Sequence, residues 1–129
     1  MNEVFSAIYN RLVSDMYPVK VFDHVPQDLD SSQYPFVRIN PIETTNNDTD
    51  TENGFSATVT IVSFSRYRGL QEINKLTDFV YQSLHHWRIP NTANYHVGDI
   101  HEVSRQTINA PDGVTRNAIQ QFALYFEPR

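Results

Sequence analysis

The chain has 129 residues, 40% of them hydrophobic and 19% charged, as is usual for a globular protein. Ten basic and fifteen acidic residues leave a formal net charge of −5, which disfavours stable binding to nucleic acid, because that binding depends on Lys and Arg. The chain has no cysteine, which excludes disulfides, and no apolar run approaches the ~18 residues of a membrane helix. We therefore expect a single domain over residues 1–129 with no membrane association.

The N-terminal part begins with a predicted helix over residues 2–16, in which apolar side chains share one face. Pro18 ends this helix, because proline disfavours helical geometry in the preceding residue. A short strand follows at 19–23, and a second strand spans 34–40. Pro35 places the start of this second strand either at a sheet edge or at the first residue of the strand.

An acidic segment follows at residues 43–54, which we predict to be a loop. It carries Glu43, Asp48, Asp50 and Glu52 and no basic residue. One interpretation is a solvated tip that keeps the protein soluble. The other is a projection whose charge repels phosphate and lines a passage for DNA. Calcium binding is disfavoured, because the spacing lacks the central Gly and terminal Glu of an EF-hand.

Residues 55–64 alternate as a strand with two partly apolar sides, so one side can cover helices and the other can face a neighbouring molecule. The pattern at 69–87 predicts a second amphipathic helix, stopped by Pro90. Two closing strands, at about 94–107 and 114–127, flank a turn at 109–113. The order of elements predicts an α+β fold with a mostly antiparallel sheet and two helices packed on one face.

Two arginines lie symmetrically about the predicted turn, Arg105 before it and Arg116 after it. A hairpin could place them nearly opposite each other, where like charges are destabilising unless an anion lies nearby. We expect that anion to come from carboxylates of a neighbouring subunit. The alternatives are that the register differs or that both side chains turn into solvent.

The chain offers no pattern typical of catalysis, a cofactor or a metal site. No serine has the glycine neighbours of a nucleophile elbow, and four glycines leave no phosphate-binding loop. His96 and His101 point to opposite faces of one predicted strand, and His85 and His86 are splayed by about 100° on a helix. We therefore predict no enzyme, no cofactor and no metal.

Taken in order, these segments resemble the tail-completion, or tail-terminator, proteins of long-tailed bacteriophages. The resemblance covers essentially the whole chain and rests on the N-terminal helix and on these segments: 25–27 (Val-Pro-Gln), 34–39 (Tyr-Pro-Phe-Val-Arg-Ile), 64–69 (Phe-Ser-Arg-Tyr-Arg-Gly), the helix with Glu72 and Leu76, Arg105, Asp112-Gly113 and Arg116. The family often has Trp where this chain has Phe64. Arg66 and Arg68 join Arg105 and Arg116 as candidate subunit-interface residues.

The resemblance implies a virion protein of the tail or neck, assembled in the host cytoplasm. Copies would form a ring, usually of six subunits, that terminates the tail tube and joins tail to head. Its partners would then be further copies of itself, the tail tube protein and the connector protein of the head or neck. A head-closure or neck component is an alternative role, and a small α+β enzyme or ligand-binding domain is another.

Overall fold

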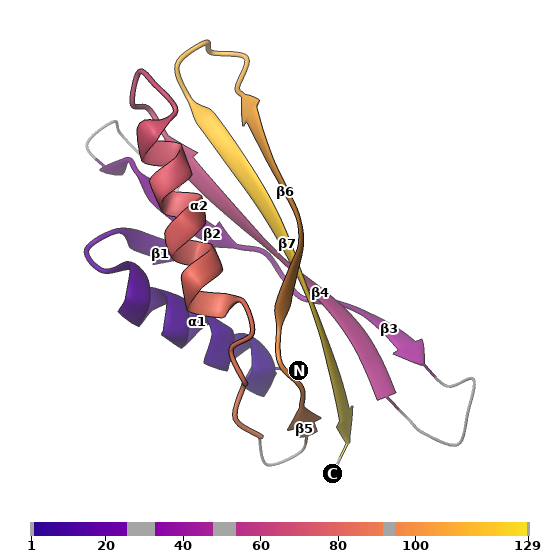
Figure 1. Ribbon diagram of the computed structural model, residues 1–129. Helices are drawn as coiled ribbons and strands as arrows, with labels where there is room; N and C mark the ends of the chain where they lie inside the picture. The colour runs from indigo at the N-terminus through magenta and orange to yellow at the C-terminus, as the bar shows by residue number, and fades with distance from the viewer. Residues whose placement is uncertain (1, 26–32, 48–53, 92–94, 129) are drawn as a thin grey trace.

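The structure, a computed structural model, describes residues 2–25, 33–47, 54–91 and 95–128 (Figure 1). Its fold is α+β, as the sequence predicts. The elements are α1 (Asn2–Met16), β1 (Lys20–Phe22), β2 (Phe36–Ile39), β3 (Glu43–Asn47), β4 (Gly54–Ser65), α2 (Gln71–Leu84), β5 (Tyr95–Val97), β6 (His101–Asn109) and β7 (Arg116–Pro128). Neither α1 nor α2 has the length and apolarity needed to cross a membrane.

The strands form one mixed sheet, with β1, β2, β4, β7 and β5 side by side in that order. In addition, β3 pairs with the beginning of β4, and β6 pairs with the beginning of β7. The predicted mostly antiparallel sheet is wrong, because β1 and β2 are parallel. The thirteen residues between them, 23–35, form a connection long enough to bring the chain back in the same direction.

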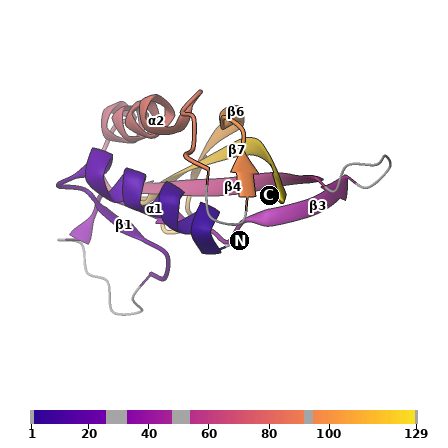
Figure 2. The ribbon, with the colours of Figure 1, turned by 90° about the horizontal axis from the view of Figure 1, so that it is seen from below.

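The centre of the sheet is the antiparallel pair of β4 and β7. It runs without interruption from Phe55 opposite Phe126 to Ser65 opposite Arg116. With 12 residues, β4 is roughly 36 Å long at ~3.3 Å per residue. The β3 end of this pair extends away from both helices in two perpendicular views (Figures 1 and 2).

The first helix confirms the prediction for residues 2–16. Four apolar side chains at every fourth position, Val4, Ile8, Leu12 and Met16, are all buried. That spacing places them along one side of an α-helix. The helix therefore contributes a continuous apolar stripe to the core.

The second helix ends three residues earlier than predicted, at Leu84 instead of 87. The amide of His85 donates to the Tyr81 carbonyl and closes the last turn. His86 then takes a left-handed conformation with φ 59°, and its amide donates to Ile100. The chain thus leaves the helix to meet the start of β6, so Pro90 is not the cause of the end.

Two other predicted boundaries are wrong. The first part of the acidic segment is the strand β3, since residues 43–47 pair with β4. The closing strand predicted at 94–107 is divided into β5 and β6. The division lies at Gly98, whose amide donates to the Tyr125 carbonyl at 2.9 Å; a Cβ there would lie 3.3 Å from the same oxygen.

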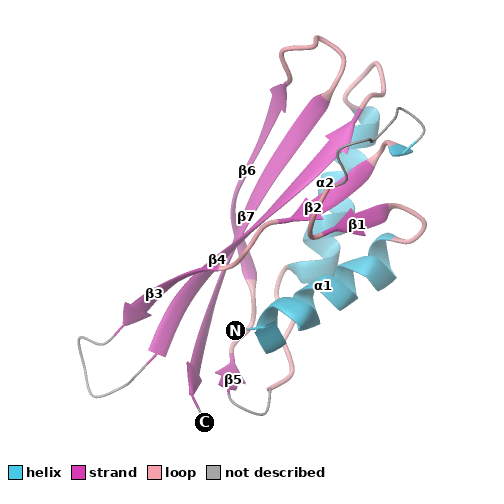
Figure 3. Cartoon of the chain, turned by 180° about the vertical axis from the view of Figure 1, so that it is seen from behind, coloured by secondary structure: helices cyan, strands magenta, loops and turns pink. Residues whose placement is uncertain are grey.

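One buried cluster unites side chains from both helices and from strands β1, β2, β4, β5 and β7. Figure 1 looks onto α2 with strands behind it, and Figure 3 looks onto strands with α2 behind them. The helix α2 contacts β4, β6 and β7, whereas α1 contacts α2 and β1. The two helices are joined by Arg11 and Asp15 of α1, which bind the carbonyl and the hydroxyl of Ser83 at 2.6 Å and 2.7 Å.

The other face of the sheet is covered near β2 by aromatic rings. Phe36 stacks on Phe64 with ring centroids 4.5 Å apart, and it meets Phe22 and Tyr34 edge-on. Phe36 is buried, so this cluster closes one end of the face that the helices do not cover.

Candidate functional site

Three of the four candidate arginines lie at one end of the molecule. Residues 66–70, which connect β4 to α2, lie beside the turn at 110–115 between β6 and β7 (Figure 1). We call these two segments, together with Arg116, the arginine end. Arg66 joins them, because its Nε donates to Thr115 Oγ1 at 3.1 Å and its Nη2 lies 3.9 Å from the Asp112 carboxylate. Its guanidinium also lies 4.5 Å from the centre of the Tyr34 ring, a distance typical of a cation–π contact.

The turn at 110–115 is organised by Asp112. One carboxylate oxygen accepts the amides of Val114 and Thr115, both at 2.8 Å, and the other accepts the Thr115 hydroxyl at 2.7 Å. The Thr115 amide and hydroxyl, then the Val114 amide, lower the pKa of Asp112 from 3.8 to about 2. Gly113 occupies the left-handed position, with φ 74°. The predicted turn at 109–113 is confirmed within this segment.

The arginine end also exposes apolar side chains. Tyr67, Leu70 and Val114 each have about half of their surface exposed, at 51%, 53% and 51%. Arg68 is exposed beside them, and Arg116 donates from Nη1 to the Tyr67 carbonyl at 3.3 Å. Exposed aromatic and aliphatic side chains among arginines are a composition typical of protein interfaces.

The predicted juxtaposition of Arg105 and Arg116 is wrong. Arg105 pairs with Gln120 across the β6–β7 hairpin, whereas Arg116 pairs with Asn109. The hairpin is centred two residues further along the chain than the symmetric spacing assumes, since Asn109 and not Arg105 lies opposite Arg116. The bulge between Glu102 and Ser104 lies beyond Arg105 and does not change this pairing. The two guanidinium groups are therefore held in different surroundings.

Arg105 already has carboxylate partners within its own chain. Its Nε lies 3.1 Å from both oxygens of Glu102, and its Nη1 lies 3.4 Å from Asp78 on α2. Glu102 in turn accepts a hydrogen bond from the buried amide of Gln120 at 2.8 Å, and that amide also donates to the Thr77 carbonyl at 3.0 Å. This network links β6 to α2, so the arrangement accounts for Arg105 without an anion from a neighbouring subunit.

The acidic segment is only partly described. Glu43 begins β3, where its side chain is exposed and its backbone pairs with Thr58 of β4. Asp48, Asp50 and Glu52 lie outside the described residues. The flanking residues Asn47 and Gly54 pair with each other at the end of the β3–β4 hairpin. Glu43 therefore lies far along β4 from Ser65, where the arginine end begins.

The two sides of β4 differ in how its own chain covers them. On the side of the helices, Ala57, Val59 and Ile61 are buried. On the other side, Val62 is buried and Phe64 is half-buried within the aromatic cluster, while Thr58 and Thr60 are half-buried. The second side is thus more polar toward the β3 end than the alternation in the sequence indicates.

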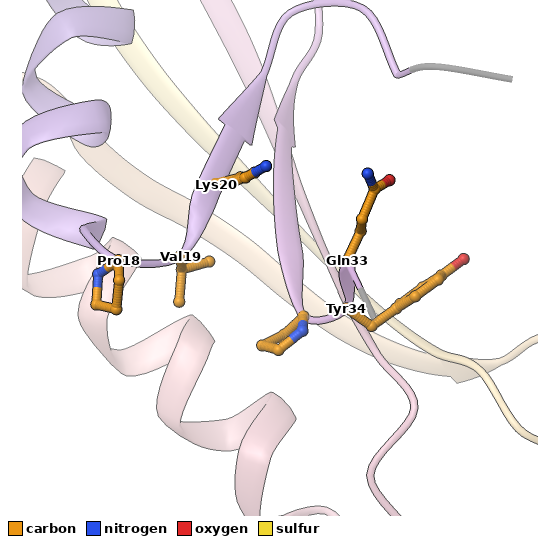
Figure 4. A pocket seen from close by; sticks show the side chains of 6 residues that line it. Pro18, Val19, Lys20, Gln33 and Tyr34 are labelled. Carbon is orange, nitrogen blue, oxygen red and sulfur yellow. The ribbon is translucent and has the colours of Figure 1, made fainter. Parts of the chain in front are cut away.

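A hollow of about 420 Å³ lies beside β1. In Figure 4, one side is formed by Pro18, Val19 and Lys20, and the other by Gln33 and Tyr34. Lys20 is the charged side chain in this lining, which offers no pair of carboxylates or imidazoles for acid–base chemistry.

Among the described residues, no group of three or more His, Asp or Glu side chains could hold a metal ion. His96 lies on β5 and His101 on β6, not on one strand as predicted. His85 and His86 follow α2 with ring centroids 4.0 Å apart. His85 Nδ1 accepts the amide of Glu102, and a hydrogen bond with His86 lowers the pKa of Asp99. These imidazoles thus connect the end of α2 to the segment around β6.

Sequence reasoning missed two parts of this surface. The contact of Tyr34 with Arg66 joins the segment before β2 to the segment after β4, and no local spacing signals it. The Asp112–Thr115 pair does have a local signal, because an Asp followed three residues later by Thr can bond within a turn.

Comparisons with known proteins match this architecture. A search of curated proteins found no match. Among solved structures, a chain described as "Virion of native gene transfer agent (GTA) particle" is similar with a TM-score of 0.78 at 14% sequence identity, over 95% of this chain and 92% of that chain. That similarity shows a shared fold. In sequence, residues 6–127 match the family described as tail completion protein gp17. Because this match spans nearly the whole chain, the protein belongs to the tail completion protein gp17 family.

Proposed function

We propose that this protein is a tail terminator, a structural protein whose copies form a ring that ends the phage tail tube and joins it to the head. The family match over residues 6–127 carries the proposal, since it assigns a structural role in the phage tail. The fold shared with a chain from the virion of a gene transfer agent particle supports it. In this role the protein acts by binding other proteins and performs no catalytic step.

The whole chain serves as one building block of the ring in this proposal. A closed ring needs contacts between two different surfaces of each copy, repeated around an axis. We place both helices on the outside, covering one face of the sheet, and the other face toward the central passage. Six copies are the number that we expect.

The arginine end supplies a docking surface in this arrangement. Arg66, Arg68 and Arg116 gather there with exposed Tyr67 and Val114. Such a surface suits an acidic partner with an apolar patch, either the tail tube protein or the head connector. The acidic residues Glu43, Asp48, Asp50 and Glu52 face the passage, where their charge keeps DNA from binding.

Imaging and mass measurement of the purified protein test the ring. Negative-stain images should show rings with a central hole, and mass photometry should give about six chain masses at high concentration or after addition of tail tubes. Particles should contain the protein at the tail or neck after assembly in the host cytoplasm, which immunogold labelling detects. Only monomers, without binding to tubes, would overturn the proposal.

A binding comparison distinguishes the terminator from a neck component. The purified protein is captured separately with tail tube protein and with head connector protein. A terminator binds the end of the tube, whereas a head-closure component binds the connector and leaves free tubes unoccupied. Binding to the connector alone would replace the first assignment by the second.

A further inference from the structure

Four strands, β1, β3, β5 and β6, pair along one edge only among the described residues, and the longest of them are β3 and β6. The strand β6 pairs with β7 alone, and β3 pairs with β4 alone. Side chains along β6 are exposed, except for Glu102, which is half-buried. In Figures 1 and 3, β6 and β3 border the sheet. Each edge therefore presents amide and carbonyl groups to which a further strand can bond.

The two edges lack lysine and proline, which commonly protect a sheet edge against strand addition. Proteins commonly block exposed edges with Lys, Pro, bulges or short strands. The five residues of β3 (Glu-Thr-Thr-Asn-Asn) include no Lys or Pro, nor do the nine residues of β6. The bulge in β6 lies near its beginning, between Glu102 and Ser104, so residues 104–109 continue as a regular strand.

Strand directions allow the two edges to join. Across the sheet, β3, β4, β7 and β6 are each antiparallel to the next strand. The strand β6 consequently runs opposite to β3. If a second copy adds its β3 to β6 in the same orientation, the alternation of directions continues from copy to copy.

The offset between the edges also fits a closed ring. Through β7, β6 lies level with residues 58–65 of β4, whereas β3 lies level with residues 54–58. The midpoints differ by about five and a half residues, which is roughly 18 Å at ~3.3 Å per residue. Strands of closed sheets tilt by ~35–45°, and four strands ~4.8 Å apart then accumulate an offset of roughly 13–19 Å. Each copy can thus contribute four strands to a continuous closed sheet.

We infer that the ring is closed by strand addition, with β6 of one copy pairing antiparallel to β3 of the next copy. This inference rests on the proposed ring and identifies the contact that forms it. The strand β1 is the other open edge on the β3 side, but it has three residues and contacts α1. With five residues, and extending away from both helices, β3 is the accessible edge (Figure 2).

Cysteine cross-linking tests the contact on a clean background, because the chain has no cysteine. Thr44 and Thr107 lie on the same side of the sheet, since their partners Ala57 and Ala118 both belong to the buried cluster beneath the helices and Ala118 pairs with Ser63, six residues after Ala57 on β4. The double variant Thr44→Cys/Thr107→Cys should form a ladder of linked chains on oxidation. A second double variant, Thr44→Cys/Asn109→Cys, tests a pairing shifted by two residues along β6 and should be linked in the same way if that register is the one that forms. The matched control is Lys20→Cys/Thr107→Cys, which should remain at least tenfold less linked. Stronger linking of the Lys20 pair would overturn the inference.

Two proline variants test the contact without cross-linking. Successive amides of an edge strand point to alternate sides, so of Gln106→Pro and Thr107→Pro one removes a bond to β7 and the other removes an outward donor. In the variant that keeps the melting temperature of the wild type, the fraction of chains assembled in rings should fall at least tenfold. The strand contact alone would be overturned if the wild type forms rings, the cysteine pairs do not cross-link and the stable proline variant still assembles. Absence of rings in the wild type would instead overturn the proposed function.

Discussion

At the tip of the β6–β7 hairpin, the Asp112 carboxylate accepts bonds from two amides and one hydroxyl. We expect Asp112→Asn to lower the melting temperature at pH 7, because the amide nitrogen of Asn cannot accept the Thr115 hydroxyl. The pKa of Asp112 lies at about 2 in the folded chain, below its ordinary value of 3.8. Its contribution to stability is therefore complete above pH ~4 and is lost as the pH falls through about 2.

Thermal melts from pH 7 to pH 1.5 check this expectation. The difference between wild type and Asp112→Asn should be largest at neutral pH and should shrink toward zero at the acidic end. Exposed Asp23 provides a matched control, since Asp23→Asn should leave the melting temperature nearly unchanged. A difference that stays constant across this range would contradict the assigned role of the carboxylate.

Part of the candidate site could be predicted from single residues, and part could not. The turn containing Asp112 and Gly113 has a local chemical signature, and the structure confirms it. The position of Arg105 relative to Arg116 depends on where the hairpin is centred, and Asn109 is the residue that pairs with Arg116. The sequence marks the turn but does not fix which residues pair across it, so symmetric counting about residues 110–111 misplaces Arg105 by four residues.

At the scale of elements, α1 is attached to the core by its apolar stripe. Leu12 is fully buried, whereas the neighbouring Val13 is 41% exposed. We expect Leu12→Ala to reduce the free energy of unfolding by about 2–5 kcal/mol, because it removes buried methyl groups and leaves a cavity. Val13→Ala should change it by less than about 0.5 kcal/mol. Urea titration followed by circular dichroism measures both values, and similar losses in the two variants would contradict the assigned orientation of α1.

The elements differ in how far their sequences predict them. The first helix was predictable because four buried residues repeat at every fourth position. The strand β3 was not, because its polar residues resemble a loop and it is held by backbone bonds to β4. The end of α2 was also missed, since Trp87 continues the helical apolar pattern although it packs against the core from outside the helix. Periodicity identifies buried faces, but it does not report backbone pairing between distant segments.

Across the whole molecule, charge is unevenly distributed, with three of the ten basic residues at the arginine end. We expect Arg68→Glu to leave rings intact but to weaken their binding to the partner of the arginine end, the tail tube protein or the head connector. The loss of affinity should be up to about fivefold for each exposed ion pair that is lost. Exposed ion pairs contribute ~0.2–1 kcal/mol, and 1.4 kcal/mol is a factor of ten. The control is Arg88→Glu, an exposed arginine between α2 and β5. Surface plasmon resonance measures the affinity at low and at high salt, and the difference from wild type should be smaller at high salt. An equal loss of affinity in Arg68→Glu and Arg88→Glu would contradict specific docking at the arginine end.

The acidic residues give the last prediction, because they test which way the ring faces. Replacing Glu43, Asp48, Asp50 and Glu52 by their amides changes the formal net charge from −5 to −1. If these side chains line the passage, rings and particles should still form, but DNA should leave the particle more slowly, because phosphates are no longer repelled. Potassium efflux or dye-exclusion measurements on purified particles after triggering record the rate. Neutralising four acidic residues outside this segment (Asp23, Asp28, Asp30 and Glu127) provides a control with the same net charge. If the variant neutralised at residues 43, 48, 50 and 52 releases DNA as fast as the wild type, the acidic segment lies outside the passage. If that variant and the control variant both release DNA slowly, the effect comes from net charge alone.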